Sequence, residues 1–374
     1  MSEDPDLPQP DRLEGAPHPR DTPKLFGQHE PEAEMLEALG WNRLHHAWLL
    51  SGPPGVGKAT FAWRAAKYLL ATAPVDPDDM FGGPPEPETL DTDPDQSVLH
   101  RISAGSEARL LVLRRPWDTK GKRLKQDITV DEARKLRSFF GLSSPDGGRR
   151  VVIVDAADDM NVNASNALLK LLEEPPANAV FLLVNHQPAR LLATIRSRCR
   201  VSRFKSLNTA DLQAALTQAT GDAAMPPELT ALAEGSVGRA IQLQQAQGPA
   251  LYTQIVGIIA SLPRLDRGLV LRLAGGLTGR EAPARLDLIL ALVDQALTRL
   301  ARRGATGEPL QPAAPNEETA FSTLCPDPGY ARHWAQAASG LTARVRRGAA
   351  VNVDPQTQLL DLFHRLAETA PSGR

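Results

Sequence analysis

A glycine-rich loop, enclosed by an apolar run and a helical run, most strongly limits the fold of this 374-residue chain. The loop consists of Gly52, Pro53, Pro54, Gly55, Val56, Gly57 and Lys58. Glycines allow successive backbone N–H groups to face one phosphate chain, and the following helix adds the positive end of its dipole. A lysine at the end of such a loop supplies a charge between the outer phosphates. Because a strand-like run at residues 46–51 precedes the loop, the sequence predicts a P-loop in an α/β domain.

Apolar runs typical of buried parallel strands alternate with helical patterns from Pro23 to about Phe204. The strand candidates are residues 46–51, 110–113, 150–155 and 180–184. Beyond Phe204 the chain is rich in Ala, Leu and Gln at helical spacing. Helices are predicted at 282–303, 330–347 and 355–368, the last with Asp354 as its N-cap. We therefore expect an α/β domain with a parallel sheet, followed by all-α domains.

Proline-rich stretches suggest where the domains begin and end. Residues 1–22 hold five prolines and few apolar anchors, so we expect a disordered leader. The α/β domain spans 23–205 and contains, at 72–96, an insertion crowded with Pro, Asp and Gly that we expect to be flexible. A break near Pro263 separates a small helical domain at 206–262 from a larger one at 263–374.

Composition argues against several classes of protein. A formal net charge of -2 disfavours a surface built mainly to hold nucleic acid. Cys199 and Cys325 are the only cysteines, too few for a disulfide framework or an all-cysteine zinc site, and they fit a reducing compartment. The N-terminus lacks the apolar core of a signal peptide, and no apolar run reaches the roughly 20 residues that cross a bilayer. We expect a cytoplasmic protein with no membrane partner.

The groups that would hydrolyse a nucleotide are incomplete. Ala59 stands where Ser or Thr would give its hydroxyl to Mg²⁺. Thr60 can touch an inner phosphate, but one step along a helix rotates a side chain by about 100° from the metal-binding position. Asp155 ends its strand as an Mg²⁺-holding carboxylate would, whereas Ala156 cannot orient a water molecule. These residues predict nucleotide binding without efficient hydrolysis.

Three short motifs carry a family resemblance. They are Asn166-Ala167-Leu168-Leu169-Lys170, Leu172-Glu173-Glu174-Pro175-Pro176 and Ile195-Arg196-Ser197-Arg198-Cys199. Together with the P-loop and the C-terminal segment VNVDPQTQLLDLF, they resemble the AAA+ clamp-loader family of bacterial DNA polymerase III, its delta prime branch above all. The resemblance spans roughly residues 23–370. It implies an AAA+ P-loop domain, a helical lid at 206–262 and a C-terminal collar at 263–374 that holds a ring-like assembly together.

The resemblance also implies roles for three polar residues. Arg198 corresponds to the arginine finger that one subunit inserts into its neighbour's ATP site, where a guanidinium braces the charge on the transferred phosphoryl group. Asn185 corresponds to the sensor of the γ-phosphate, although this family more often has a hydroxyl there. Arg239 lies in the second-sensor region of the lid. Without the resemblance, each would be interpreted as an ordinary surface residue.

The implied function is that of an ATP-hydrolysis-impaired scaffold that supports loading of the sliding clamp onto primed DNA. The implied partners are the gamma/tau ATPases and delta, with the clamp and primer-template DNA contacted through the complex. ATP or ADP is the expected P-loop ligand, with Mg²⁺ only alongside the nucleotide. Relatives often carry a four-cysteine zinc module where this chain has its cysteine-free insertion, so we expect no zinc. Nucleotidyltransferase activity would belong only to the polymerase III holoenzyme.

Two alternative functions stay open at this point. An ATP-hydrolysing motor subunit of the gamma/tau type would need Lys58 and Asp155 to suffice without the hydroxyl and the glutamate. A stand-alone nucleic-acid-binding module would use the basic residues 114–125, which either form a solvated loop or contact DNA phosphates.

Other polar residues near the motifs have structural interpretations. Asn163 is a natural N-cap for the helix that ends before Pro175. Thr129 and Glu132 form a capping box for another packing helix. Asp158 is interpreted as a loop residue rather than as a substitute for the missing base.

Overall fold

The structure is a computed structural model that describes residues 8–41, 43–73, 87–141, 148–222, 225–279, 282–350 and 354–370, with the backbone alone at 339, 341–344 and 346–350. The chain divides into two compact units. The first comprises Met1–Ala224 and Glu234–Ile241, and the second Met225–Ala233 and Gln242–Arg374. Each unit has its own apolar core. The division into AAA+ domain, lid and collar stays a prediction.

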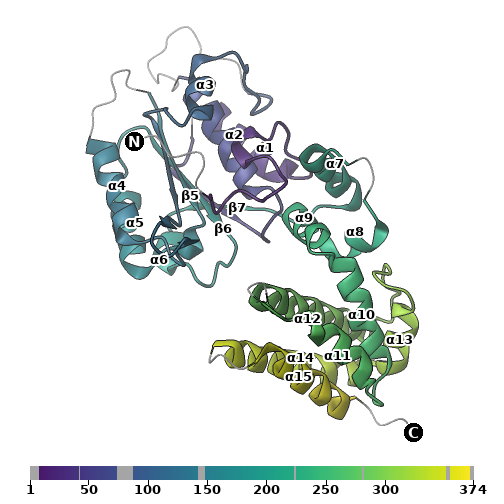
Figure 1. The fold of residues 1–374 in the computed structure, drawn as a ribbon. Coiled ribbons are helices and arrows are strands. Elements are labelled where there is room, and N and C mark those ends of the chain that lie inside the picture. Colours follow the sequence, from purple (N-terminus) through teal and green to yellow (C-terminus); the bar gives the residue numbers. More distant parts are fainter. Residues whose placement is uncertain are drawn as a thin grey trace. The chain divides into compact units, whose positions relative to one another are not determined.

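A five-stranded parallel sheet forms the centre of the first unit, in the order β2-β5-β6-β1-β7 (Figure 1). Its strands are β1 (Ala47–Ser51), β2 (Leu110–Arg114), β5 (Arg150–Asp155), β6 (Ala179–Asn185) and β7 (Arg200–Arg203). The four predicted strands are confirmed to within one residue at each end. The inner strands β1, β5 and β6 are visible in the sequence because helices bury both faces of a parallel sheet, which makes such strands continuous apolar runs.

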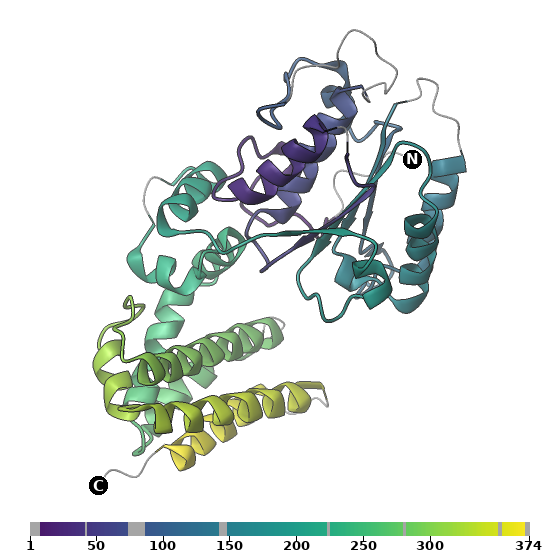
Figure 2. The ribbon, with the colours of Figure 1, turned by 180° about the vertical axis from the view of Figure 1, so that it is seen from behind.

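Helices cover both faces of this sheet, as the two opposite views show (Figures 1 and 2). One face is covered by α1 (His29–Gly40), α2 (Lys58–Ala71) and α3 (Ser97–Ser103), and the other by α4 (Val130–Gly141), α5 (Val162–Glu173) and α6 (Ala193–Arg196). Strand β1 shows the alternation that this requires. Trp48 and Leu50 belong to the core with α1 to α3, whereas Ala47 and Leu49 belong to the core with α4 to α6. Helix α7 (Thr209–Thr220) completes the larger elements of this unit.

The second unit is helical throughout its described part. Its helices are α8 (Pro227–Ala233), α10 (Gly248–Ala260), α11 (Arg267–Gly275), α12 (Ala282–Thr306), α13 (Glu317–Leu324), α14 (Pro328–Ala350) and α15 (Pro355–Thr369), while α9 (Val237–Gln245) begins in the first unit and ends in the second. Helices α12 and α14 lie side by side in both views. Asp354 caps α15 as predicted, because its Oδ2 accepts the Thr357 N–H at 2.8 Å. Among the described helices, none combines the length and apolar character of a membrane span.

The prediction of a disordered leader is wrong for residues 8–22, whereas residues 1–7 lie outside the described part. The side chains of Asp11 and His18 are buried there, and Asp11 Oδ2 lies 3.2 Å from His18 Nε2. Asp11 Oδ1 also accepts Arg114 Nη1 at 2.9 Å. Proline content gave the wrong answer because a few buried charges, rather than apolar side chains, hold this segment in place.

Three other local predictions need correction. Helix α5 begins two residues earlier than expected, since Asn161 rather than Asn163 accepts the capping bond from Ala164 N. Strand β7 was not predicted. It is a short edge strand in which Val201 and Arg203 are exposed, so it lacks the apolar run of a buried strand. The basic stretch 114–125 is not a simple loop, because β3 (Trp117–Asp118) and β4 (Arg123–Leu124) form a small hairpin there. Most of the expected flexible insertion, residues 74–86, lies outside the described residues.

Candidate functional site

The carboxyl ends of the inner strands meet at one edge of the sheet, here called the carboxyl edge. Ser51 at the end of β1 pairs with Asn185 at the end of β6, and Arg114 at the end of β2 pairs with Asp155 at the end of β5. The P-loop leaves β1 at the same edge and leads into α2. The structure therefore brings the predicted loop, Asp155 and Asn185 together, at the place where open parallel sheets bind ligands.

The P-loop has a conformation that its glycines make possible. Gly55 and Gly57 have φ angles of 72° and 100°, in the left-handed region that side chains rarely adopt. Val56 between them is buried and anchors the loop to the core. From the other side, Ser236 Oγ donates to Pro54 O and Val237 N donates to Gly55 O, both at 2.9 Å. The loop is thus fixed in shape by residues of the predicted second-sensor region.

Lys58 lies beneath this loop with only 2% of its surface exposed. Its Nζ donates to Gly52 O at 2.7 Å and also to Pro53 O. Burial lowers the pKa of Lys58 to about 8, although the nearby Asp155 and Asp158 carboxylates act in the opposite direction. Loss of hydration therefore destabilises the charged ammonium of Lys58, and an anionic group bound at the loop would stabilise it.

Asp155 and Asn185 are the polar groups at the ends of β5 and β6. Burial raises the pKa of Asp155 to about 7, and the negative charge of Asp11 adds to this effect. Asn185 is fully buried, and its Oδ1 and Nδ2 have no hydrogen-bond partner among the described residues. Buried amides are almost always paired, so the Asn185 side chain indicates a place for water or a polar ligand at the carboxyl edge.

The residues that would complete hydrolysis chemistry are apolar here. Ala59 and Thr60 are the second and third residues of α2, so the Ala59 methyl occupies the position from which a hydroxyl would reach Mg²⁺. Ala156 follows Asp155 and is buried. The site offers a phosphate cradle, a buried lysine and one carboxylate for Mg²⁺, but it fits the full metal coordination of an active ATPase poorly.

Arg198 lies away from this site, at the amino end of β7. Its backbone N–H donates to Ile195 O at 3.0 Å, immediately after α6. The other end of β7 leads to Phe204, whose N–H donates to Ser51 O beside the P-loop at 2.8 Å. The four residues of β7 span about 13 Å between these two points. Arg198 is therefore at the edge of the sheet opposite to the P-loop of its own chain.

Comparisons with known proteins address the same residues. A family model described as "DNA polymerase III, delta subunit" matches residues 27–208, which include the P-loop, Asp155, Asn185 and Arg198. The Escherichia coli DNA polymerase III subunit delta prime is 31% identical over 275 residues, which cover 72% of this chain and 75% of that protein. The chain belongs to the delta prime family of DNA polymerase III subunits. This confirms the clamp-loader resemblance and the AAA+ type of fold expected from the sequence.

Two further comparisons are more limited. The Pseudomonas aeruginosa subunit delta prime is 38% identical over 166 residues, and the matched part covers 44% of this chain and only 45% of that protein's length. A DNA polymerase III gamma subunit-related protein of Thermotoga maritima has a TM-score of 0.39 at 18% identity, over 90% of this chain and 99% of that one. The family assignment therefore rests on sequence.

Arg239 is near the P-loop but is engaged in its own segment. The backbone of Gly238 contacts Gly55, since a Cβ added to Gly238 would lie 3.2 Å from Gly55 Cα. Arg239 Nη1 forms an ion pair with Glu234 Oε2 at 3.3 Å, and its N–H donates to Ser236 Oγ. The segment carrying Arg239 thus supports the loop, while the contact of its guanidinium with a phosphate stays a prediction.

Two further polar residues lie at the site: Asp158, which the sequence analysis interpreted as a loop residue and which is buried here, and His186, which it did not identify. Asp158 accepts the backbone N–H groups of His186 and Gln187 at 3.0 and 3.2 Å, one on each carboxylate oxygen. This carboxylate therefore fastens the loop after β6 and is poorly suited to act as a base. Burial, together with the Lys58 charge, lowers the pKa of His186 to about 4, so this imidazole is neutral. Its position directly after Asn185 was the available signal.

The Asp11 segment is the other feature missed from sequence. The Asp11 carboxylate is close enough to Asp155 to raise its pKa, and Arg114 beside Asp155 binds Asp11 directly. Leu25, a little further along the chain, packs against Gly57. Residues from the N-terminal segment consequently form part of the wall around the P-loop and Asp155.

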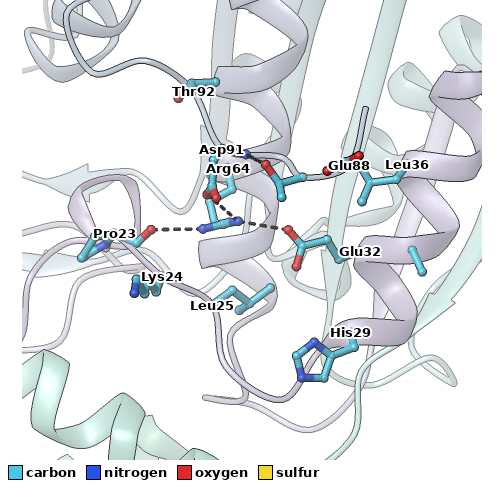
Figure 3. Close-up of a pocket in the computed structure, with 12 residues that line it drawn as sticks. Pro23, Lys24, Leu25, His29, Glu32, Leu36, Arg64, Glu88, Asp91 and Thr92 are labelled. Atoms are coloured by element: carbon cyan, nitrogen blue, oxygen red, sulfur yellow. Dashed lines mark hydrogen bonds and ion pairs between the residues drawn. The ribbon is translucent and has the colours of Figure 1, made fainter. Parts of the chain in front are cut away.

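A pocket of about 590 Å³ lies on the outer side of α2 and shares Leu25 with the wall around the P-loop. Figure 3 shows Arg64 at its centre, with dashed lines to Pro23, Glu32 and Asp91. The guanidinium donates to Pro23 O at 3.1 Å and pairs with Glu32 and Asp91 at 3.0 and 3.1 Å. Since Arg64 already serves three acceptors, the pocket is best explained as the seam where residues 88–92 are tied to α1 and α2.

Proposed function

We propose that the chain is the delta prime subunit of a DNA polymerase III clamp loader, a scaffold impaired in ATP hydrolysis that lends Arg198 to a neighbouring ATPase subunit. The position of Arg198 carries this proposal. A guanidinium at the amino end of β7 is on the wrong side of the sheet to reach its own P-loop, but it is accessible, with 36% of its side chain exposed. Its useful partner is therefore a phosphate held by another subunit.

The weakened P-loop site supports the same division of roles. ATP or ADP would be held by the loop and Lys58, and Mg²⁺ only together with the nucleotide, through Asp155. The hydroxyl and the base that hydrolysis requires are replaced by Ala59 and Ala156. Asp158 cannot take over as the base because backbone N–H groups occupy its oxygens. The alternative, an ATP-hydrolysing gamma/tau-type motor, would need the hydroxyl and the base that this chain lacks.

The proposed partners follow from the family. They are the gamma/tau ATPases and delta, and the sliding clamp and primer-template DNA are engaged through the complex in the cytoplasm. The basic hairpin at 114–125 is a weaker candidate for DNA contact than its sequence suggests. Arg114 and Arg115 are already paired with Asp11 and Asp159 at 2.9 and 3.1 Å. No polymerase or nucleotidyltransferase activity is assigned to this chain alone.

The arginine-finger role is tested in a reconstituted complex in which only the neighbouring ATPase subunit is active. Arg198→Ala should leave assembly intact and lower ATP turnover at that site by about 10³-fold or more, the usual contribution of such an arginine. Arg196→Ala is the matched control, since Arg196 is an exposed residue of the same segment whose side chain donates only to Pro188 O, at 3.3 Å, in the described structure. Equal turnover in the two variants would exclude the role of Arg198.

A further inference from the structure

Two contacts hold the Arg198 side chain in place at the amino end of β7. Its Nη1 donates to Thr194 O at 3.0 Å, and its Nη2 pairs with Glu173 Oε1 at 2.8 Å. Thr194 O also accepts Ser197 Oγ at 3.0 Å, so the backbone of α6 is one fixed support. Glu173 is the second support, and it comes from a different element, the last residue of α5. A planar guanidinium held at two of its nitrogens has a defined orientation.

Glu173 is unusual in its own helix. A carboxylate at the C-terminal end of a helix faces the negative end of the helix dipole, which disfavours it. Lys170, in the same last turn, is the charge expected there. Helix stability therefore does not explain Glu173, and neither does the apolar core, since 42% of its side chain is exposed. Within the described structure, the ion pair with Arg198 is the one contact that explains a carboxylate at this position.

The location of α5 places this pair on a surface that a neighbour can reach. Leu172 O accepts His46 Nε2 at 3.1 Å, just before β1 begins, so the end of α5 lies at the amino edge of the sheet. Both partners of the ion pair are partly exposed. Exposed ion pairs are weak, whereas a phosphate offers a guanidinium more charge and two-point hydrogen bonding. Glu173 can thus orient Arg198 and still release it.

We propose that Glu173 is a positioning residue for Arg198. Its carboxylate holds the Arg198 guanidinium in one orientation at the subunit surface until the neighbour's phosphate replaces the carboxylate. This inference rests on the proposed function of Arg198 as a finger in trans. Glu173 touches no nucleotide in this account and acts through Arg198 alone. Its contribution is the alignment of a long side chain that would otherwise sample many rotamers.

The test is a double-mutant cycle in the same reconstituted complex, with Glu173→Ala, Arg198→Ala and the combined variant. Glu173→Ala should lower kcat of the neighbouring site about fivefold with an unchanged KM for ATP, equivalent to about 1 kcal/mol at 1.36 kcal/mol per factor of ten. In the Arg198→Ala background, the same substitution should have no further effect on kcat. Glu173→Gln, which keeps an oxygen acceptor, should give a smaller loss.

Glu30→Gln serves as the matched control, because it removes another exposed ion pair of the same 2.8 Å length, to Lys205. It should leave kcat unchanged. A kcat for Glu173→Ala that equals or exceeds the wild-type value would overturn the positioning role, as would an equal fold-loss in the Arg198→Ala background. If Arg198→Ala itself has no effect, the proposed function fails instead, so the two failures are distinguishable.

Discussion

At the residue scale, the chemistry of the site depends on how burial shifts the pKa values of Asp155 and Lys58. These two side chains are neighbours at the carboxyl edge, and each has a pKa moved toward neutrality. For Asp155 the cost of losing water outweighs the attraction of Lys58, partly because Asp11 adds a second negative charge nearby. The site therefore holds its charges under strain when only protein groups surround them, which is typical of a place prepared for a charged ligand.

This strain gives a stability prediction with a definite sign. Asp155 releases its proton near 3.8 in the unfolded chain and near 7 in the folded one, so folding takes up a proton between these values. Stability contributed by the protonated form is complete below about pH 4 and is lost as the pH rises to about 7. Asp155→Asn should consequently stabilise the first unit at pH 8 by about 2 to 4 kcal/mol, and by less at pH 5.

Urea unfolding of the nucleotide-free protein at both pH values, followed by hydrogen exchange of the β5 peptides, measures this difference. Asp155→Asn also removes the attraction between Asp155 and Lys58, which reduces the expected gain in stability toward the lower end of the range of about 2 to 4 kcal/mol. If the variant is no more stable than wild type at pH 8, ionisation of the buried Asp155 does not destabilise the folded protein.

At the element scale, the sequence predicted what depends on periodicity and missed what depends on contacts. The strands β1, β5 and β6 were predictable because burial on both faces makes them apolar. Strand β2 is a half-buried edge strand, and it was predictable from its apolar run alone. The P-loop was predictable because its glycines and Lys58 are local in sequence. In contrast, the roles of Asp11, Asp158 and Glu173 arise from partners far away along the chain, from the 25-residue separation of Glu173 and Arg198 to the 103-residue separation of Asp11 and Arg114.

A buried ion pair joins three helical elements of the second unit. Glu317 Oε1 accepts the Tyr252 hydroxyl at 2.6 Å and Arg299 Nε at 2.7 Å, while Oε2 accepts Arg299 Nη2 at 3.0 Å and Ala313 N at 2.6 Å. Glu317 and Arg299 are both buried. One carboxylate thereby connects α10, α12 and the start of α13.

Removing that carboxylate should be costly because it leaves the Arg299 charge buried without its partner. Glu317→Gln should destabilise the second unit by about 3 to 5 kcal/mol. Hydrogen exchange of α12 peptides in increasing urea reports on this unit separately. Asp361→Asn, which weakens an exposed pair with Arg365 on α15, is the control and should cost less than about 1 kcal/mol. Similar protection of α12 in the two variants would argue against the pinning role of Glu317.

At the scale of the whole molecule, the two edges of one sheet have different tasks. The carboxyl edge keeps a phosphate cradle in which the metal-binding hydroxyl and the base are replaced by Ala59 and Ala156. The amino edge carries Arg198, supported by Glu173, on an accessible surface. This arrangement explains why a member of the delta prime family retains the motif of an ATPase although its chemistry is incomplete. On the proposed function, such a chain contributes to hydrolysis only in company with another subunit.

ATP turnover by the purified chain alone tests the division of roles between the two edges. Its turnover should be no higher than that of a Lys58→Ala variant prepared in the same way, because the cradle alone does not activate water. The comparison with Lys58→Ala removes any contribution from contaminating ATPases. Turnover that is clearly above this background and disappears in the Lys58→Ala variant would contradict the division of roles between the two edges.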